Sequence, residues 1–421
     1  MVLRTRSRTL VASLAGLSLV TLTACGSQPS DDPGRKESDQ VLQSRVAMLP
    51  RDASVDFTGT ARGLLTLGHD LSTHLPASSG DGGNQVFSPA SLAIAFAMLR
   101  EGADAASAQE IDDVIGLPEN RRAAYNALLH ELSDVGPGDR LEINDAVFLD
   151  PELEVKPAYL DAIKRWYGAG LHETPFPHPA LEDINAWVKT KTHDRIPRLL
   201  DDLDASAVLA LVNTIYLNAK WETPFSKNAT HDAAFTTTEG GTTTVKMMHL
   251  NTTLDYATGD GWQAVRLPYA GGSLSMWVLV PDGSGDPKEL LAASALATAE
   301  SSATPTQVRL SLPRWESETK ASLVDVLKRL GMGHTFEDGA FPGISDEPRL
   351  GVSQVVQQAN ITVGEKGTEA AAATAIVMEL TGVPVLEGVE VTADHPFAYA
   401  IVHDETGVPL FEGVVGNPSA K

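Results

Sequence analysis

The chain has 421 residues, of which 43% are hydrophobic and 21% are charged, a composition typical of globular proteins. A chain of this length forms two or three domains or one large domain. Its formal net charge of −23 argues against nucleic acid or a polyanion such as heparin as a partner, because both carry dense negative charge.

The first 24 residues have the form of an export signal. Three arginines within the first eight residues precede an apolar run at 10–22, which has signal-peptide length and is too short to span a bilayer as a helix. The run ends in Leu22-Thr23-Ala24-Cys25, which resembles the bacterial lipobox, in which the cysteine is lipidated. A plain signal peptide with a chance cysteine is the alternative. Because Cys25 is the only cysteine, the chain has no intramolecular disulfide.

We therefore expect an exported lipoprotein, anchored through Cys25 to the outer face of a bacterial cytoplasmic membrane or released outside the cell. Residues 25–56 are rich in polar residues, Pro and Gly and show no hydrophobic period before Val41, so we interpret them as a disordered, lipid-anchored linker. Residues 57–421 contain no comparable linker, no repeat and no further apolar span. We expect them to form a single domain.

Hydrophobic periods and end signals predict helices first and then mainly strands. The predicted helices are at 64–75, 88–99, 106–115, 121–132, 157–166, 181–192 and 320–330. The predicted strands are at 86–87, 141–149, 207–217, 242–248, 264–268, 274–280, 307–312, 397–402 and 410–415. This order indicates an α+β fold with antiparallel or mixed sheets.

The run at 207–217 is apolar and rich in β-branched residues, which predicts a strand buried on both faces. Asn213 lies in the middle of this run. It needs buried hydrogen-bond partners, because an unpaired buried amide costs about 1–3 kcal/mol.

Residues 364–384 form a segment of small side chains between a charged turn and a predicted loop. In an extended chain, one face of this segment comprises Thr368, Ala370, Ala372, Thr374, Ile376 and Met378. Such a face fits into a sheet without large voids. An exposed helix rich in alanine is the alternative, because alanine is the best helix former.

No catalytic apparatus is convincing in this sequence. The segment 271–275 misses the nucleophile elbow G-x-S-x-G by its last glycine, and no metalloprotease, phosphate-loop or dinucleotide motif is present. Ser317 and Lys320 match the S-x-x-K pattern of penicillin-recognising enzymes but lack the partner motifs. We predict a protein that is not an enzyme and that binds no cofactor and no metal.

Several segments together resemble the serpin family over about 64–418, nearly the whole mature chain. They are 84–91 with Ala95 and Met98, 210–221 with Pro224 and Phe225, Met247-Met248, 336–345, 365–374, 395–397 and 409–418. The resemblance implies the serpin fold, with helices around a large mixed sheet and two smaller sheets. It also implies an exposed reactive-centre loop, here at about 365–388.

The resemblance further implies an irreversible inhibitor of serine proteases. The protease cleaves the loop and forms an acyl-enzyme, and the loop then inserts into the large sheet and traps the protease. Residues of the inhibitory hinge consensus are Glu365, Gly367, Thr368, Glu369, Ala370, Ala371, Ala372, Ala373 and Thr374. Their small inward side chains favour inhibition over a non-inhibitory binding role, and a serine hydrolase is a remote alternative.

The family's usual spacing from Glu365 places the reactive bond at Thr381-Gly382, and a shift of one residue places it at Leu380-Thr381. No Lys or Arg lies between Gly367 and Lys421. The implied targets are therefore elastase-like, subtilisin-like or chymotrypsin-like proteases, bound covalently by a monomer.

The family also has a buried polar network where the large sheet opens. The resemblance assigns Ser88, Ser91 and Asn213 to this network, and Gln357 stands where the family has a histidine. We expect the network to persist without a titrating group, which argues against pH-dependent gating. Trp221 matches the family's structural tryptophan, and the lack of a basic cluster around Arg121-Arg122 argues against heparin activation.

Overall fold

The computed structural model describes residues 40–75, 82–348, 350–368 and 388–420. The chain divides into two units, residues 1–37 and residues 38–421, and all the described residues belong to the second unit. None of the helices in these described ranges is long and apolar enough to cross a bilayer.

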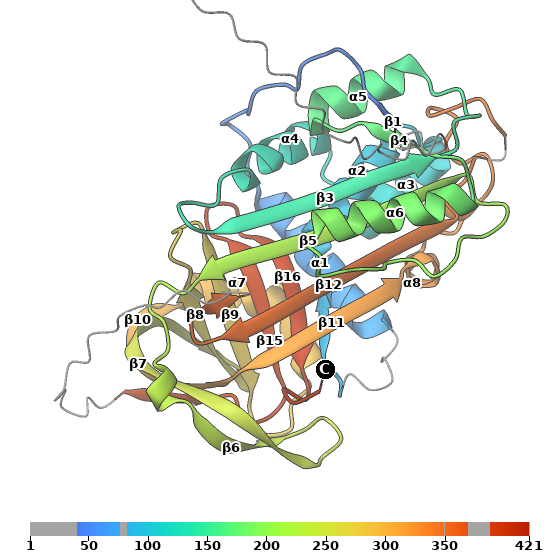
Figure 1. Cartoon of the computed structure of the whole chain (residues 1–421). Coiled ribbons are helices and arrows are strands. Elements are labelled where there is room, and N and C mark those ends of the chain that lie inside the picture. Colours follow the sequence, from blue (N-terminus) through green and yellow to red (C-terminus); the bar gives the residue numbers. More distant parts are fainter. Residues whose placement is uncertain (1–39, 76–81, 349, 369–387, 421) are drawn as a thin grey trace, which may run out of the picture. The chain divides into compact units, whose positions relative to one another are not determined.

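Helices and two sheets make up the described unit (Figure 1). The α-helices are α1 (Thr58–His74), α2 (Pro89–Arg100), α3 (Ala105–Ile115), α4 (Arg121–Leu132), α5 (Pro157–Tyr167), α6 (His178–Lys191), α7 (Ala293–Ser302) and α8 (Val324–Leu330). Short 3-10 turns are η1 (Lys227–Ala229), η2 (Pro287–Leu291) and η3 (His334–Phe336).

The large sheet has seven strands among the described residues. In spatial order they are β1 (Gln40–Leu42), β4 (Leu171–Glu173), β3 (Arg140–Leu149), β5 (Leu209–Lys220), β13 (Gly367–Thr368), β12 (Gln354–Gly364) and β11 (Trp315–Ser322). The sheet is mixed, because β3 and β4 pair parallel, as do β5 and β12, and the other neighbours pair antiparallel.

The second sheet has nine strands in the described part of the chain. Eight of them are, in spatial order, β14 (Val389–Thr392), β10 (Thr304–Pro313), β7 (Thr242–Gly259), β8 (Trp262–Pro268), β9 (Leu274–Pro281), β15 (Phe397–His403), β16 (Val408–Val415) and β2 (Gln85–Phe87), and β6 (His231–Thr236) pairs with β7. The two smaller sheets that we expected are continuous here, because the long β7 pairs with β6 and β10 first and with β8 at its end.

Helix α2 lies between the two sheets and packs on β3, β5 and β16. Every residue of α2 except Arg100 is buried, and many of them are alanines, which let the strands approach the helix closely. Ser88 caps the helix as its sequence predicts, since its Oγ accepts a hydrogen bond from Ser91 N at 3.2 Å, and Pro89 occupies the first helical position. Helix α6 covers the opposite face of β3 and β5, where it forms a second, smaller core (Figure 1).

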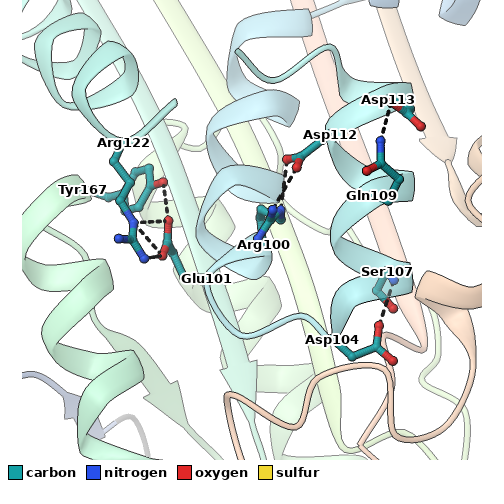
Figure 2. Close-up of polar contacts among 9 residues, drawn as sticks. All are labelled: Arg100, Glu101, Asp104, Ser107, Gln109, Asp112, Asp113, Arg122 and Tyr167. Atoms are coloured by element: carbon teal, nitrogen blue, oxygen red, sulfur yellow. Dashed lines mark hydrogen bonds and ion pairs between the residues drawn. The ribbon is translucent and has the colours of Figure 1, made fainter. Parts of the chain in front are cut away.

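Ion pairs hold the C-terminal end of α2 (Figure 2). Arg100 binds Asp112 of α3 with two hydrogen bonds, at 3.0 and 2.8 Å. The buried carboxylate of Glu101 accepts hydrogen bonds from Arg122 of α4 and from the Tyr167 hydroxyl of α5, the latter at 3.2 Å. Arg122 is therefore engaged in an ion pair within the fold.

The structure corrects the predicted linker. Residues 40–42 form β1 on the edge of the large sheet, and further on Leu49 N donates to the Arg165 carbonyl at 2.8 Å. Leu49 also accepts a hydrogen bond from Asn126 at 3.3 Å through its own carbonyl. The segment from residue 40 to residue 56, predicted to be disordered, thus belongs to the domain, which starts before the predicted boundary at residue 57.

Around the large sheet, one prediction was wrong and one strand was missed. Residues 320–322 are the end of β11 and not the start of a helix, and only Val324–Leu330 is helical. The strand β12 was not predicted at all, although the strand over 207–217 was, and β5 is buried on both faces as expected.

Candidate functional site

The strands β5 and β12 meet at a seam in the middle of the large sheet. They pair directly only between residues 210–214 of β5 and residues 354–358 of β12. At the other end of the two strands, β13 enters between them and pairs antiparallel with both. In the described structure, residues 215–218 of β5 have neither β12 nor β13 as a ladder partner. The start of the predicted hinge is thus already a strand within this sheet.

The turn between β12 and β13 is anchored through its backbone. Trp221 N donates to the Lys366 carbonyl and Phe225 N donates to the Glu365 carbonyl, both at 2.9 Å. The indole Nε1 of Trp221 donates to the Gly364 carbonyl at 2.9 Å. Trp221, the predicted structural tryptophan, therefore holds the turn that precedes the loop.

The Glu365 side chain fixes the same turn through charge. Its Oε1 accepts hydrogen bonds from Arg314 Nε and from Thr230 Oγ1, both at 2.8 Å. Burial raises the pKa of Glu365, but the hydrogen bonds from Arg314, its own backbone N–H and Thr230 outweigh burial, so the pKa lies below its ordinary value. Glu365 is ionised at neutral pH, and the turn is tied to the ends of β10 and η1.

Two features hold β13 in the sheet. The buried Thr368 hydroxyl shares a hydrogen bond of 2.6 Å with the Tyr269 hydroxyl, and the Tyr269 ring stacks on Trp221 with a centroid separation of 4.6 Å. Gly367 has φ +146°, and a Cβ there would lie 2.0 Å from the Ala219 carbonyl oxygen. Only glycine fits this position.

The polar residues assigned to the opening network do lie together. Gln357 of β12 bridges the seam, since its Nε2 donates to Asn213 Oδ1 of β5 at 3.0 Å and to the Ser88 carbonyl at 2.9 Å. Its Oε1 accepts a hydrogen bond from Ser88 N at 3.0 Å. Asn213 Nδ2 donates to Ser91 Oγ of α2. All four residues are buried, and the buried amide of Asn213 finds the partners it needs.

Our expectation that this network has no titrating group is wrong. Asp145 of β3 stands directly opposite Asn213, and its Oδ1 accepts hydrogen bonds from Asn213 Nδ2 and, at 3.4 Å, from Ser91 Oγ. The signal for it was visible in the sequence. In the alternating strand over 140–149, Asp145 takes a position on the core-facing side, whose other members are Leu141, Ile143, Val147 and Leu149.

Other site residues have different outcomes. Three sets of predicted site residues lie outside the described residues. They are the hinge residues 369–374, the candidate reactive bonds at Leu380, Thr381 and Gly382, and the lipid-attachment residue Cys25. Tyr269, Arg314 and Thr230 were missed, because nothing in their local sequence pattern indicates a shared contact with the hinge.

In the S-x-x-K match, Ser317 is buried and Lys320 lies on the opposite face of β11, where it binds Asp201 at 2.9 Å. These two residues therefore do not form a catalytic pair.

Residues 63–418 match a family model described as Serpin (serine protease inhibitor). The chain belongs to the serpin family. This serpin is 32% identical over 355 residues to leukocyte elastase inhibitor A of Rattus norvegicus, covering 80% of this chain and 92% of that protein. It is 31% identical over 335 residues to an uncharacterized serpin-like protein of Methanosarcina acetivorans, covering 76% and 78% of the two chains. It is also similar to the crystal structure of the thermophilic serpin tengpin in the native state, with a TM-score of 0.81 and 25% identity over 90% of this chain and 100% of that one.

Proposed function

We propose that this serpin inhibits serine proteases as a suicide substrate, through insertion of its cleaved loop between β5 and β12. The observation that carries the proposal is β13, which enters between these strands in a defined register. The covalent step is ordinary acyl transfer. The protease serine Oγ attacks the carbonyl carbon of the reactive bond, the C–N bond breaks, an ester forms, and the freed amine takes a proton.

The register of β13 indicates how the rest of the loop would insert after cleavage. Thr368 pairs with Ala219 of β5 and Val363 of β12, so each further residue of the loop moves one position along both strands. Residues 369–372 would then face 218–215 of β5, which have no ladder partner on that side among the described residues. The inward residues Ala370 and Ala372 would face Leu217 and Ile215, where small side chains are needed.

The same count places Thr374 between Asn213 and Gln357. Insertion would break the direct hydrogen bond across the seam and supply a hydroxyl at the same place, which can donate and accept. The ladder hydrogen bonds gained on both sides of a new strand, at about 1 kcal/mol each, amount to the order of 10 kcal/mol over a dozen residues. Insertion on this scale is strongly favourable.

For specificity, we propose elastase-like, subtilisin-like or chymotrypsin-like targets, with cleavage at Thr381-Gly382 or Leu380-Thr381. The absence of Lys and Arg from 368–420 of the sequence supports this choice, and so does the similarity to a leukocyte elastase inhibitor.

We further propose that the protein is exported and lipid-anchored through Cys25. The Cys25→Ser variant should then lose the detergent partitioning of the native protein, and equal partitioning of both forms would contradict the anchor.

The test is to mix the protein with elastase, subtilisin and chymotrypsin and to run denaturing gels. A covalent complex shifted by the mass of the protease is expected, and mass spectrometry of the released peptide identifies the bond. Thr368→Arg should convert the inhibitor into a substrate, because an arginine cannot occupy the buried site of Thr368. Thr66→Arg on the exposed face of α1 is the matched control. Clean turnover by every protease would refute the proposal.

A further inference from the structure

Asp145 gives the sheet-opening network an ionisable member. Its Oδ1 receives N–H from Asn213 and O–H from Ser91, so both neighbouring side chains act as donors towards it. Asn213 directs its amide nitrogen to Asp145 and Ser91, and its carbonyl oxygen therefore points across the seam to Gln357 Nε2. If the Asn213 amide were reversed, two NH₂ groups would face each other at the seam and this hydrogen bond would be lost. Asp145 thus sets the polarity of the bond between β5 and β12.

No cationic side chain accompanies this carboxyl group among the described residues that influence it. On α2, Arg100 pairs with Asp112, and Arg140 on β3 pairs with Glu142. On β4, the titratable residues His172 and Glu173 pair with Phe148 and Leu149 of β3, and not with Asp145. The charged side chains of α6 belong to the other face of the sheet, and β5 and β12 contribute the neutral Asn213 and Gln357.

Partial positive charge comes from the N-terminal end of α2, which Ser88 caps and whose first turn carries Ser91, a partner of Asp145. Burial raises the pKa of Asp145 to about 8, against the hydrogen bonds from Asn213 and Ser91, which lower it. A carboxylate at this place is costly because it is partly withdrawn from water and has no counter-ion among the described residues that influence it.

We propose that Asp145 is a positioning residue of the large sheet, which orients Asn213 across the seam and whose ionisation makes β5 and β12 easier to separate. The ligand of this device is the proton. The proposal rests on the proposed function for its biological meaning, since loop insertion requires the seam to open, but the opening itself can be measured without a protease.

The direction of the pH effect follows from linkage. When the seam is open, water reaches Asp145 and its pKa returns to the ordinary value of about 3.9. Asp145 binds its proton more tightly in the closed seam than in the open seam. The stability that this proton gives to the closed seam is therefore fully present below about pH 4, and it declines as the pH rises towards 8. Within this window, the ratio of open to closed seam rises by up to tenfold per pH unit, and above about pH 8 it is level.

The experiment is hydrogen exchange of peptides that cover 210–214 and 354–358, between pH 5 and pH 9. Asp145→Asn keeps an acceptor for Asn213 and Ser91 but does not titrate, so the ratio of wild-type to variant exchange at each pH removes the intrinsic pH dependence of exchange. We expect this ratio to increase from pH 5 to about pH 8 and then to level off. Asp202→Asn, the same change at an exposed position, should follow the wild type.

A second variant separates orientation from titration. Asp145→Ala removes the acceptor that orients Asn213, so the seam should exchange faster than in Asp145→Asn at every pH and without the pH window. A wild-type profile in Asp145→Asn, or equal exchange in Asp145→Asn and Asp145→Ala, would overturn the inference. If the seam responds to pH as expected but no protease is trapped, the inference holds and the proposed function fails. If proteases are trapped but hydrogen exchange at the seam does not change with pH, the proposed function holds and the inference about Asp145 fails.

Discussion

Substitution of Gly367 by alanine tests whether β13 must lie in the sheet. The new Cβ would lie 2.0 Å from the Ala219 carbonyl oxygen and 2.7 Å from Lys220 Cα, both backbone atoms that cannot move away cheaply. The position also has a positive φ, which adds strain for any residue except glycine. The hinge is therefore expected to leave the sheet rather than tolerate the contact.

The cost has an upper limit set by what β13 contributes. Leaving the sheet forfeits the pairings of Gly367 and Thr368 with both β5 and β12, four in all, and the hydrogen bond between Thr368 and Tyr269. At ~1 kcal/mol each, these amount to about 5 kcal/mol. We expect the free energy of unfolding of Gly367→Ala to fall by up to this amount, and we expect more protease to be released by turnover because the loop can no longer start its insertion.

Urea unfolding and the stoichiometry of inhibition measure these two effects. Hydrogen exchange at residues 219 and 220, the partners of β13 on β5, reports directly on the loss of β13. Gly364→Ala is the matched control, because a Cβ at Gly364 meets no atom within 4 Å and lies in the same turn. If Gly367→Ala matches Gly364→Ala in all three measurements, insertion of β13 has no bearing on stability or inhibition.

Three other expectations concern buried carboxylates. Glu365 has a lowered pKa in the folded state, so its contribution to stability is present above the unfolded pKa of about 4.3 and is lost as the pH falls through the folded pKa. Glu365→Gln should abolish this loss of stability in acid. Thermal unfolding between pH 3 and pH 6 measures it. Glu412 is buried without a hydrogen-bond partner among the described residues, and burial raises its pKa well above the ordinary value. Its protonated form is favoured in the folded state, so the wild type should lose stability as the pH rises above about 4.3. Glu412→Gln should not show this loss. Glu405→Gln, at an exposed site, is the control. Gly68→Ala should cost about 1–3 kcal/mol by urea unfolding, because its Cβ would overlap Glu412 Oε2, and Glu412→Ala should relieve this cost if the overlap is the cause.

Local sequence signals predicted the elements whose pattern matches their own environment. The cap at Ser88 and Pro89 starts α2 where expected, and α4 spans 121–132 as predicted. The apolar run around Asn213 became a central strand, because a strand buried on both faces is apolar at every position except where a side chain has a specific partner.

The failures are cases in which pairing with distant strands decides the structure. β12 carries Gln357 and Gln358 at its centre, a pair that indicates a surface loop when only neighbours in sequence are considered. Residues 320–322 have good helix formers around them but pair with 358–356 of β12, and this ladder overrides the local preference. The network residues could be assigned by resemblance. Asp145 was missed because the resemblance did not assign it to the network, although its place on an otherwise apolar face marked it.

The two edges of the large sheet, as the described residues form it, bear on association between copies of this protein. β1 pairs with β4 and so covers one edge with a short segment of the same chain, while β11 at the other edge exposes Glu316, Glu318 and Lys320 on one face. Charged side chains on an edge strand oppose the addition of a strand from another molecule, and a short edge strand offers few hydrogen bonds to it. The short strand β13 therefore lies at the centre of a sheet whose two borders discourage association with neighbouring copies.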